Sequence, residues 1–147
     1  MEELSIYLSG KCKDLPDDGK NWRDEITRKI DVVAGCTNTR VTVVDPVKYF
    51  TYSEKKYKTQ KQVKDYFIYR IRKSDLVVVN LNDSDSSIGT AQEIQFAVDH
   101  NIPIIGFGTR NIYPWIAEVD CQVVFDTMNE VVCYIADYYM NGDKSDE

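Results

Sequence analysis

The segment Leu76-Val77-Val78-Val79-Asn80-Leu81 (LVVVNL) decides the fold of this chain. A run so rich in valine and leucine is typical of a strand that is covered on both faces, as in a parallel sheet between two layers of helices. Amphipathic helical patterns flank the run, at Lys61–Arg72 before it and at Gly89–His100 after it. Alternation of helix and strand around a buried strand indicates βαβ units with right-handed crossovers.

The same alternation extends toward both ends of the chain. The remaining apolar periodicities predict strands and helices at Leu4–Leu8, Asn21–Ile30, Val41–Val44, Pro103–Phe107, Gln122–Phe125 and Met128–Tyr139. We therefore predict an α/β fold, a three-layer doubly wound parallel sheet of five strands, flavodoxin-like or Rossmann-like. Residues 1–147 are expected to form a single domain, with a frayed polar tail at 141–147.

Composition limits the functions that this chain can have. The net charge of −6 and the 43% hydrophobic content indicate a globular protein without a nucleic-acid partner. Neither a secretion signal nor an apolar run of about 20 residues is visible, so we expect no membrane contact and a cytoplasmic location. The four cysteines lack CxxC spacing and are expected to be reduced, mostly packing residues.

Because His100 is the single histidine, most catalytic and metal-binding sites that need imidazole groups are excluded. A Cys/His metal site would require more ligands, and a Ser-His-Asp triad would have to use this one residue. His100 closes a predicted helix, where a C-terminal cap is its expected role. We therefore expect no metal and no organic cofactor, and we expect carboxylates to perform any catalysis.

Ligands of doubly wound sheets bind beyond the carboxyl ends of the strands. In this sequence small and polar residues concentrate at those ends, so we predict the binding pocket there. The candidate substrate-binding residues are Ser9, Gly10, Asp45, Asp83, Asp85, Ser87, Gly89, Thr90 and Asn111.

Glu93, in the first turn of the predicted helix at Gly89–His100, has two interpretations. The spacing Thr90-Ala91-Gln92-Glu93 fits a capping box, in which the glutamate folds back onto the Thr90 amide, and spacing alone favours that structural role. The alternative is an ionised carboxylate that attacks an anomeric carbon. Tyr7 likewise suits core packing, although it shares a strand face with Ser9 beside the predicted pocket.

Four segments together resemble the nucleoside 2-deoxyribosyltransferase family. They are Ile6–Gly10 (IYLSG), Asn21–Arg23 (NWR), Ser74–Leu81 (SDLVVVNL) and Gly89–Ala97 (GTAQEIQFA). The resemblance implies the doubly wound fold and a nucleoside or nucleotide substrate.

The resemblance also implies roles for single residues. Glu93 would be the nucleophile that forms a covalent 2-deoxyribosyl intermediate, with retention at C1', and Tyr7 would orient it. Asn111 and Trp115 align with a segment that a neighbouring subunit often contributes, which implies a homo-oligomer built on dimers.

Two positions depart from the family pattern. Phe67 stands where the family often has an aspartate that contacts the base, and Asp65 lies roughly 200° away around a helix. Base contact could then fall to one of the aspartates at the strand ends, Asp45, Asp83 or Asp85. Ser87 stands where the transferases tend to carry aspartate, whereas the related 2'-deoxynucleoside 5'-phosphate N-hydrolases have serine there. Lys11 or Arg110 could supply the countercharge for a phosphate.

Four functions therefore stay open at this point. Base exchange between 2'-deoxynucleosides is preferred. Hydrolysis of 2'-deoxynucleoside 5'-monophosphates and catalytically silent nucleotide binding rank equally after it, and signalling by a flavodoxin-like domain ranks last. The last would require acidic residues at the end of the first strand, where this chain has Tyr7-Leu8-Ser9.

Overall fold

The computed structural model describes residues 2–13, 15–49, 59–109 and 113–140. Within these ranges the strands form one sheet in the order β2-β1-β3-β4-β5, and every neighbouring pair is parallel. The strands are β1 (Glu2–Ser9), β2 (Thr39–Val44), β3 (Leu76–Asn80), β4 (Ile104–Phe107) and β5 (Val123–Phe125). The predicted doubly wound sheet is confirmed.

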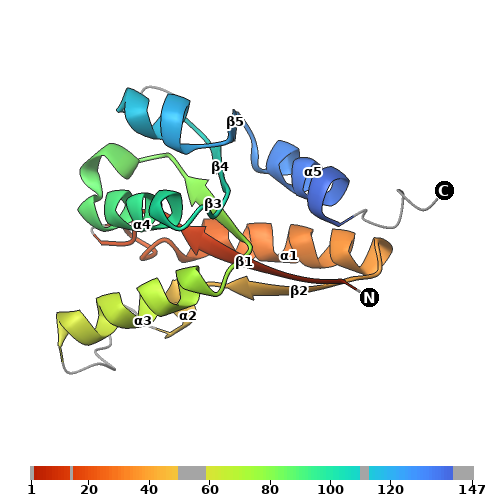
Figure 1. Ribbon diagram of the computed structural model, residues 1–147, viewed down its shortest axis with the longest axis horizontal. Helices are drawn as coiled ribbons and strands as arrows, with labels where there is room; N and C mark the ends of the chain where they lie inside the picture. The colour runs from red at the N-terminus through yellow and green to blue at the C-terminus, as the bar shows by residue number, and fades with distance from the viewer. Residues whose placement is uncertain (1, 14, 50–58, 110–112, 141–147) are drawn as a thin grey trace.

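Helices cover both faces of the sheet (Figure 1). On one face α1 (Lys20–Cys36) packs beside α5 (Met128–Tyr139), and on the other α3 (Gln60–Arg72) packs beside α4 (Ile88–Asp99). Shorter helical segments connect these elements: α2 (Pro46–Tyr49), η1 (Ser84–Ser86) and η2 (Trp115–Asp120).

Alternate residues of the strands separate two apolar cores. Ile6 and Leu8 of β1 pack toward α1 and α5, whereas Tyr7 packs with Val77 and Val79 toward α3 and α4. This alternation follows from the two-residue period of a strand. It also places Ser9 on the α3/α4 face, at the carboxyl end of β1.

The observed element bounds differ from the prediction for identifiable reasons. Helix α1 continues to Cys36 because Val33 and Ala34 extend its apolar stripe. The segment after β2, expected to be a loop, begins with α2, because Pro46 stands at the first helical position and the Asp45 carboxylate accepts a hydrogen bond from the Val47 amide at 3.0 Å. The segment before β5 contains the unpredicted π-helical turn η2.

Other expectations concern single side chains. His100 is the C-cap residue of α4, as predicted, and its ring stacks on Phe96. All four cysteines are free thiols, but only Cys121 is buried; Cys12 is half-buried, and Cys36 and Cys133 are exposed, so the expected packing role is wrong for these two. In the described parts of the chain, no helix is both long and apolar enough to cross a bilayer.

Candidate active site

A cavity of about 530 Å³ opens beyond the carboxyl ends of β1, β2 and β3. Its walls come from Gly10–Lys13 after β1, Pro46 after β2, one face of α3, and Ser86–Glu93 around the start of α4. The volume lies within the usual range for small-molecule sites, about 300–1,000 Å³. The predicted position of the pocket agrees with this geometry.

The carboxylate of Glu93 faces this cavity and is held by β1. Tyr7 donates its phenolic hydrogen to Glu93 Oε2, and Ser9 Oγ donates to Glu93 Oε1 at 2.9 Å. The capping-box interpretation is therefore wrong. Its place is taken by Ser87, which is the N-cap of α4 and whose hydroxyl accepts a hydrogen bond from the Thr90 amide at 3.3 Å. The helix consequently begins at Ile88, one residue earlier than predicted.

Burial and hydrogen bonding act on Glu93 in opposite directions. Burial raises the pKa of its carboxyl above the ordinary value, while hydrogen bonds from Tyr7 and Ser9 and the nearby Arg23 charge oppose that rise. For Tyr7, burial and the neighbouring Glu93 raise the pKa well above its ordinary value, so the phenol stays a hydrogen-bond donor. Glu93 is therefore a carboxylate that Tyr7 and Ser9 hold with two hydrogen bonds.

Behind this pair, Arg23 of α1 is almost completely buried. Its guanidinium donates to the Gly19 carbonyl at 2.8 Å and to the Gly10 carbonyl at 3.0 Å, and it also borders the cavity. Asp45, buried at the end of β2, forms an ion pair with Arg23 at 3.8 Å. Trp22 lies against Arg23 and Gly10: the Arg23 guanidinium is 4.5 Å from the Trp22 ring centroid, and a Cβ on Gly10 would approach the ring to 2.9 Å.

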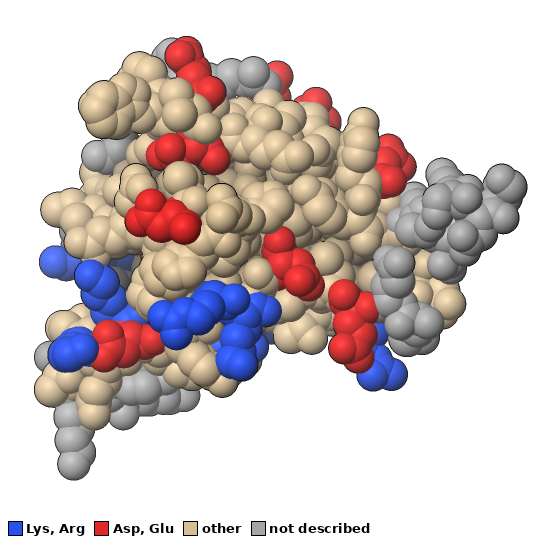
Figure 2. Space-filling view, in the orientation of Figure 1, with Lys and Arg blue, Asp and Glu red and all other residues tan. Residues whose placement is uncertain are grey.

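The opening of the cavity carries hydroxyl groups and cations. The hydroxyls of Ser87 and Thr90 are 2.7 Å apart, and Lys11 Nζ donates to Ser86 Oγ at 2.7 Å. In Figure 2 most of the blue side chains gather along α3, whose Lys64 borders the cavity. We call Lys11, Lys13 and Lys64 the rim lysines. This opening is basic although the whole chain is acidic.

The structure brings most of the predicted site residues together. Gly10, Ser87, Gly89, Thr90 and Glu93 line the cavity. Tyr7 and Ser9 reach it through Glu93, and Asp45 lies behind it, paired with Arg23.

One predicted residue lies away from the site, and others fall outside the described residues. Asp83 is exposed and does not line the cavity. The Asp85 side chain and the whole of Asn111 lie outside the described residues, as does Arg110. Phe67, the departure from the family pattern, is itself a wall of the cavity.

Sequence reasoning missed the role of Arg23. The buried stripe of α1 consists of Arg23, Ile26, Ile30 and Ala34, so a charged residue occupies an apolar helical position. A charge at such a position is a usable signal, because an arginine is seldom buried without a specific partner. Cys12 and the α3 residues Val63 and Ile68 were also not anticipated as cavity walls.

The arrangement defines a class of protein: a doubly wound α/β domain with a hydrogen-bonded carboxylate facing a pocket at the strand ends. Among the described residues, no cluster of three or more potential metal ligands is present. Residues 6–132 match the model of the nucleoside 2-deoxyribosyltransferase family, and the chain belongs to that family. It is accordingly a glycosyl-transferring enzyme or an N-glycosidase.

Solved structures share the fold at low sequence identity. A conserved protein from Enterococcus faecalis V583 superimposes with a TM-score of 0.68 at 15% identity, covering 92% of this chain and 98% of that one. The 2-deoxyribosyltransferase of Leishmania mexicana gives 0.64 at 14% identity, with 92% and 99% covered. The CMP N-glycosidase of Clostridium botulinum gives 0.55 at 14% identity, with 91% and 99% covered. A comparison with curated proteins finds no match.

Proposed function

We propose that this enzyme exchanges bases between 2'-deoxyribonucleosides by a retaining double displacement with Glu93 as nucleophile. The observation that carries the proposal is the Glu93 carboxylate, which faces the cavity while Tyr7 and Ser9 each donate a hydrogen bond to it. These two donors fix the carboxylate in one orientation. A fixed carboxylate that faces a cavity is suited to attack on an anomeric carbon.

The proposed chemistry has two displacements. A carboxylate oxygen of Glu93 bonds to C1' as the C1'–N bond breaks, and the electron pair goes to the base nitrogen, which takes up a proton. A nitrogen of the incoming base then attacks C1' on the face opposite the bond to Glu93, and this nitrogen loses its proton. The bond between C1' and Glu93 breaks and restores the carboxylate. Water in place of the second base gives hydrolysis, and both outcomes retain the configuration at C1'.

A product assay tests this function directly. Deoxyinosine and free adenine, incubated with the enzyme, should yield deoxyadenosine and hypoxanthine in equal amounts on chromatography. Glu93→Gln, which has nearly the same shape, should yield neither. Accumulation of free base and deoxyribose without exchange would exclude transfer, and binding of nucleoside without any turnover would indicate a silent binding module.

Hydrolysis of 2'-deoxynucleoside 5'-monophosphates is the second candidate. It is favoured by the Ser87 and Thr90 hydroxyls at the start of α4 and by the rim lysines, which together suit an anionic group. The fold neighbour from Clostridium botulinum is a CMP N-glycosidase.

The cap position of Ser87 permits a matched pair of variants. Both Ser87→Asp and Ser87→Asn keep a good N-cap, but only aspartate adds a negative charge. If a phosphate binds here, Ser87→Asp should lose activity on monophosphates by at least about tenfold relative to Ser87→Asn, because like charges repel in the pocket. Equal activity of the two variants on monophosphates would place the phosphate elsewhere or exclude it.

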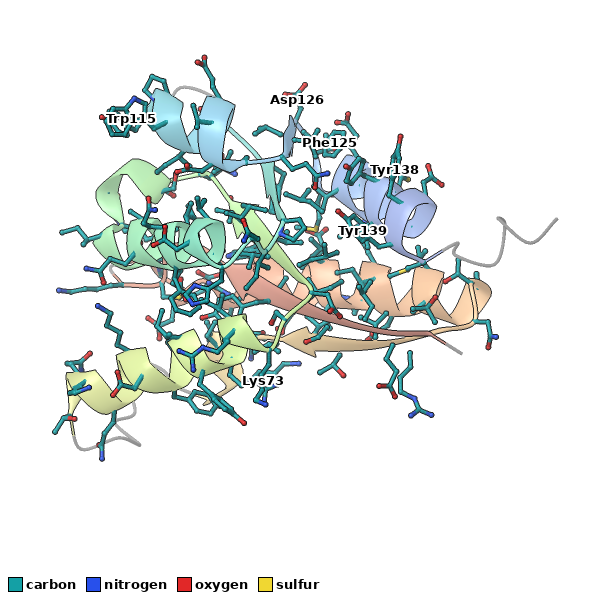
Figure 3. All side chains as sticks on the ribbon, in the orientation of Figure 1. Lys73, Trp115, Phe125, Asp126, Tyr138 and Tyr139 are labelled. Atoms are coloured by element: carbon teal, nitrogen blue, oxygen red, sulfur yellow. The ribbon has the colours of Figure 1, made fainter. Side chains whose placement is uncertain are left out.

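We further propose that the enzyme is a cytoplasmic homo-oligomer, a dimer or a multiple of dimers, that acts in nucleoside salvage. Trp115 on η2 is 66% exposed and its ring lies 5.1 Å from that of Tyr113, which supports a subunit contact on this surface. Figure 3 shows Trp115 at the outer end of η2. Light scattering of wild type and Trp115→Ala tests it: the variant should dissociate, and a monomeric wild type would contradict it.

A further inference from the structure

We propose that Arg23 is a positioning residue of the active site: it fixes the Gly10 end of the pocket and places a buried cation behind Glu93. The inference rests on the proposed role of Glu93 as nucleophile. It concerns a residue on the far side of β1 from the cavity opening, on a helix that contributes no other cavity wall among the described residues.

The first argument is the set of bonds that Arg23 makes. One guanidinium nitrogen binds the carbonyl of Gly10, which lines the cavity, and another binds that of Gly19, the N-cap residue of α1. Gly19 has a φ of 77°, and a Cβ there would approach Arg23 Nη1 to 2.5 Å. The planar fork of an arginine can join two carbonyls in this way, and a lysine ammonium cannot reproduce it.

The second argument is the cost of burying this charge. Arg23 and Asp45 are both nearly inaccessible to solvent, yet their contact at 3.8 Å is long, and Arg23 Nε and Asp45 Oδ2 have no hydrogen-bond partner within the described structure. Such a pair is weak evidence of stabilisation, because desolvation offsets most of the attraction. Packing alone would favour an apolar residue at this position of the α1 stripe.

The third argument is the electrostatic effect on Glu93. Burial raises the pKa of Glu93, and Arg23 is the charged residue whose field opposes that rise. The other titratable or polar groups around Glu93 are Tyr7 and Ser9 from β1, Cys12 from the following segment, and the rim lysines across the cavity. Because an attacking carboxylate must be ionised, removing the Arg23 charge should move the acid limb of activity to higher pH.

Three variants separate the charge of Arg23 from its geometry. Arg23→Gln removes both the charge and the fork, Arg23→Lys keeps the charge but loses the fork, and Arg28→Gln removes an exposed charge from the same helix as a control. The readout is the titration of the Glu93 carboxyl carbon by NMR in ¹³C-glutamate-labelled protein, assigned by its loss in Glu93→Gln. The pH profile of kcat is measured beside it.

Arg23→Gln should raise the Glu93 midpoint. It should lower the plateau of kcat as Arg23→Lys does, because both lose the fork, and it should lower kcat by about a further tenfold on the acid side. Arg23→Lys should keep the midpoint near that of wild type but lower the plateau, and Arg28→Gln should change neither. An unchanged midpoint in folded Arg23→Gln overturns the proposal. If this variant does not fold, Arg23→Gln/Asp45→Asn replaces the ion pair by two amides, and the same result is required of it.

The NMR titration separates the two proposals. If the wild-type protein turns over no nucleoside, but Arg23→Gln still raises the Glu93 midpoint, the role of Arg23 stands and the proposed function fails. Turnover with an unchanged midpoint would do the reverse.

Discussion

Adjacent residues of strand β1 have different surroundings on its two faces. On the α1/α5 face, Ile6 and Leu8 are fully buried among apolar side chains. On the α3/α4 face, Tyr7 and Ser9 are equally buried, but each donates a hydrogen bond to a carboxylate. One strand therefore packs into the core on one side and supplies hydrogen bonds to the Glu93 carboxylate on the other.

The two faces contribute differently to the stability of the fold, because β1 buries apolar side chains on one and holds a buried carboxylate on the other. Apolar burial of one isoleucine or leucine stabilises a fold by about 1.5–3 kcal/mol. A buried carboxylate opposes folding unless donors compensate it, and here burial still raises the Glu93 pKa despite two donors. The sheet is common to both faces, so apolar packing in the two cores can offset the cost of burying the Glu93 carboxylate.

The largest expected effect comes from removing the carboxylate that Tyr7 and Ser9 hold. Glu93→Ala should lower kcat/KM by at least about a thousandfold, because the attacking group is removed. Glu130→Ala, at an exposed glutamate of α5, is the control and should leave the activity unchanged. Steady-state kinetics on deoxynucleosides measure both, and comparable activity of the two variants would contradict the role of Glu93.

Substitution of neighbouring residues on opposite faces sharpens the comparison. Tyr7→Phe removes one donor to Glu93 and should lower kcat by about 10–100-fold, since a hydrogen bond to a charged group contributes about 1.5–3 kcal/mol. Ile6→Val should lower the free energy of unfolding by about 0.5–1.5 kcal/mol and leave kcat of the folded enzyme intact. Denaturant titration and kinetics on both proteins check this. A kcat loss in Ile6→Val as large as that in Tyr7→Phe would mean that the faces are not separable.

Burial of the Glu93 carboxyl should also lower the stability of the fold. Because the folded-state pKa of Glu93 is raised, the folded protein binds this proton more tightly than the unfolded chain does. Its contribution to stability is therefore favourable at low pH and falls as pH rises from the unfolded value of 4.5 through the folded pKa.

The neutral variant Glu93→Gln tests that cost. It should be more stable than wild type above this window, by about 0.5–2 kcal/mol, with a smaller difference below it. Thermal unfolding at a series of pH values measures the difference. A variant less stable than wild type at every pH would show that the carboxylate stabilises the fold.

The smallest expected effect compares two cysteines. Burial, with a lesser effect of Asp120, raises the pKa of Cys121 to about 12, so a thiol reagent should leave it unmodified in the folded protein. Burial also raises the pKa of the Cys12 thiol, so its modification should be slow. Because Cys12 borders the cavity, bound nucleoside should slow this modification further. Mass spectrometry after timed alkylation follows both residues. Modification of Cys12 at the same rate with and without nucleoside would place the ligand elsewhere.

The sequence was sufficient to predict the fold because local patterns and burial agree. The valine run of β3 and the alternating apolar residues of β1 indicate the same sheet that the structure contains. The pocket followed from topology alone, since parallel strands bring their carboxyl ends to one edge. The bounds of α1 were predicted less well than those of α4, because the apolar stripe of α1 continues past the predicted end at Ile30 through Val33 and Ala34.

The direction of the Glu93 side chain could not be predicted from local spacing. A capping box and a hydrogen-bonded nucleophile require the same residue type in the first turn, and the choice between them depends on Tyr7 and Ser9, 86 and 84 residues away in sequence. The pairing of Arg23 with Asp45 is likewise a contact between distant segments. The charge on the apolar stripe of α1 is a signal of a buried partner, but it does not say which residue that partner is.

The central claim is that Glu93 forms a covalent bond to C1'. Acid quenching during turnover of a deoxynucleoside, followed by peptide mapping with mass spectrometry, tests it most directly. We expect a single deoxyribosyl group on the peptide that contains Glu93, absent from Glu93→Gln, and a product that retains the configuration at C1'. An adduct on another residue, or a product of inverted configuration, would contradict the account.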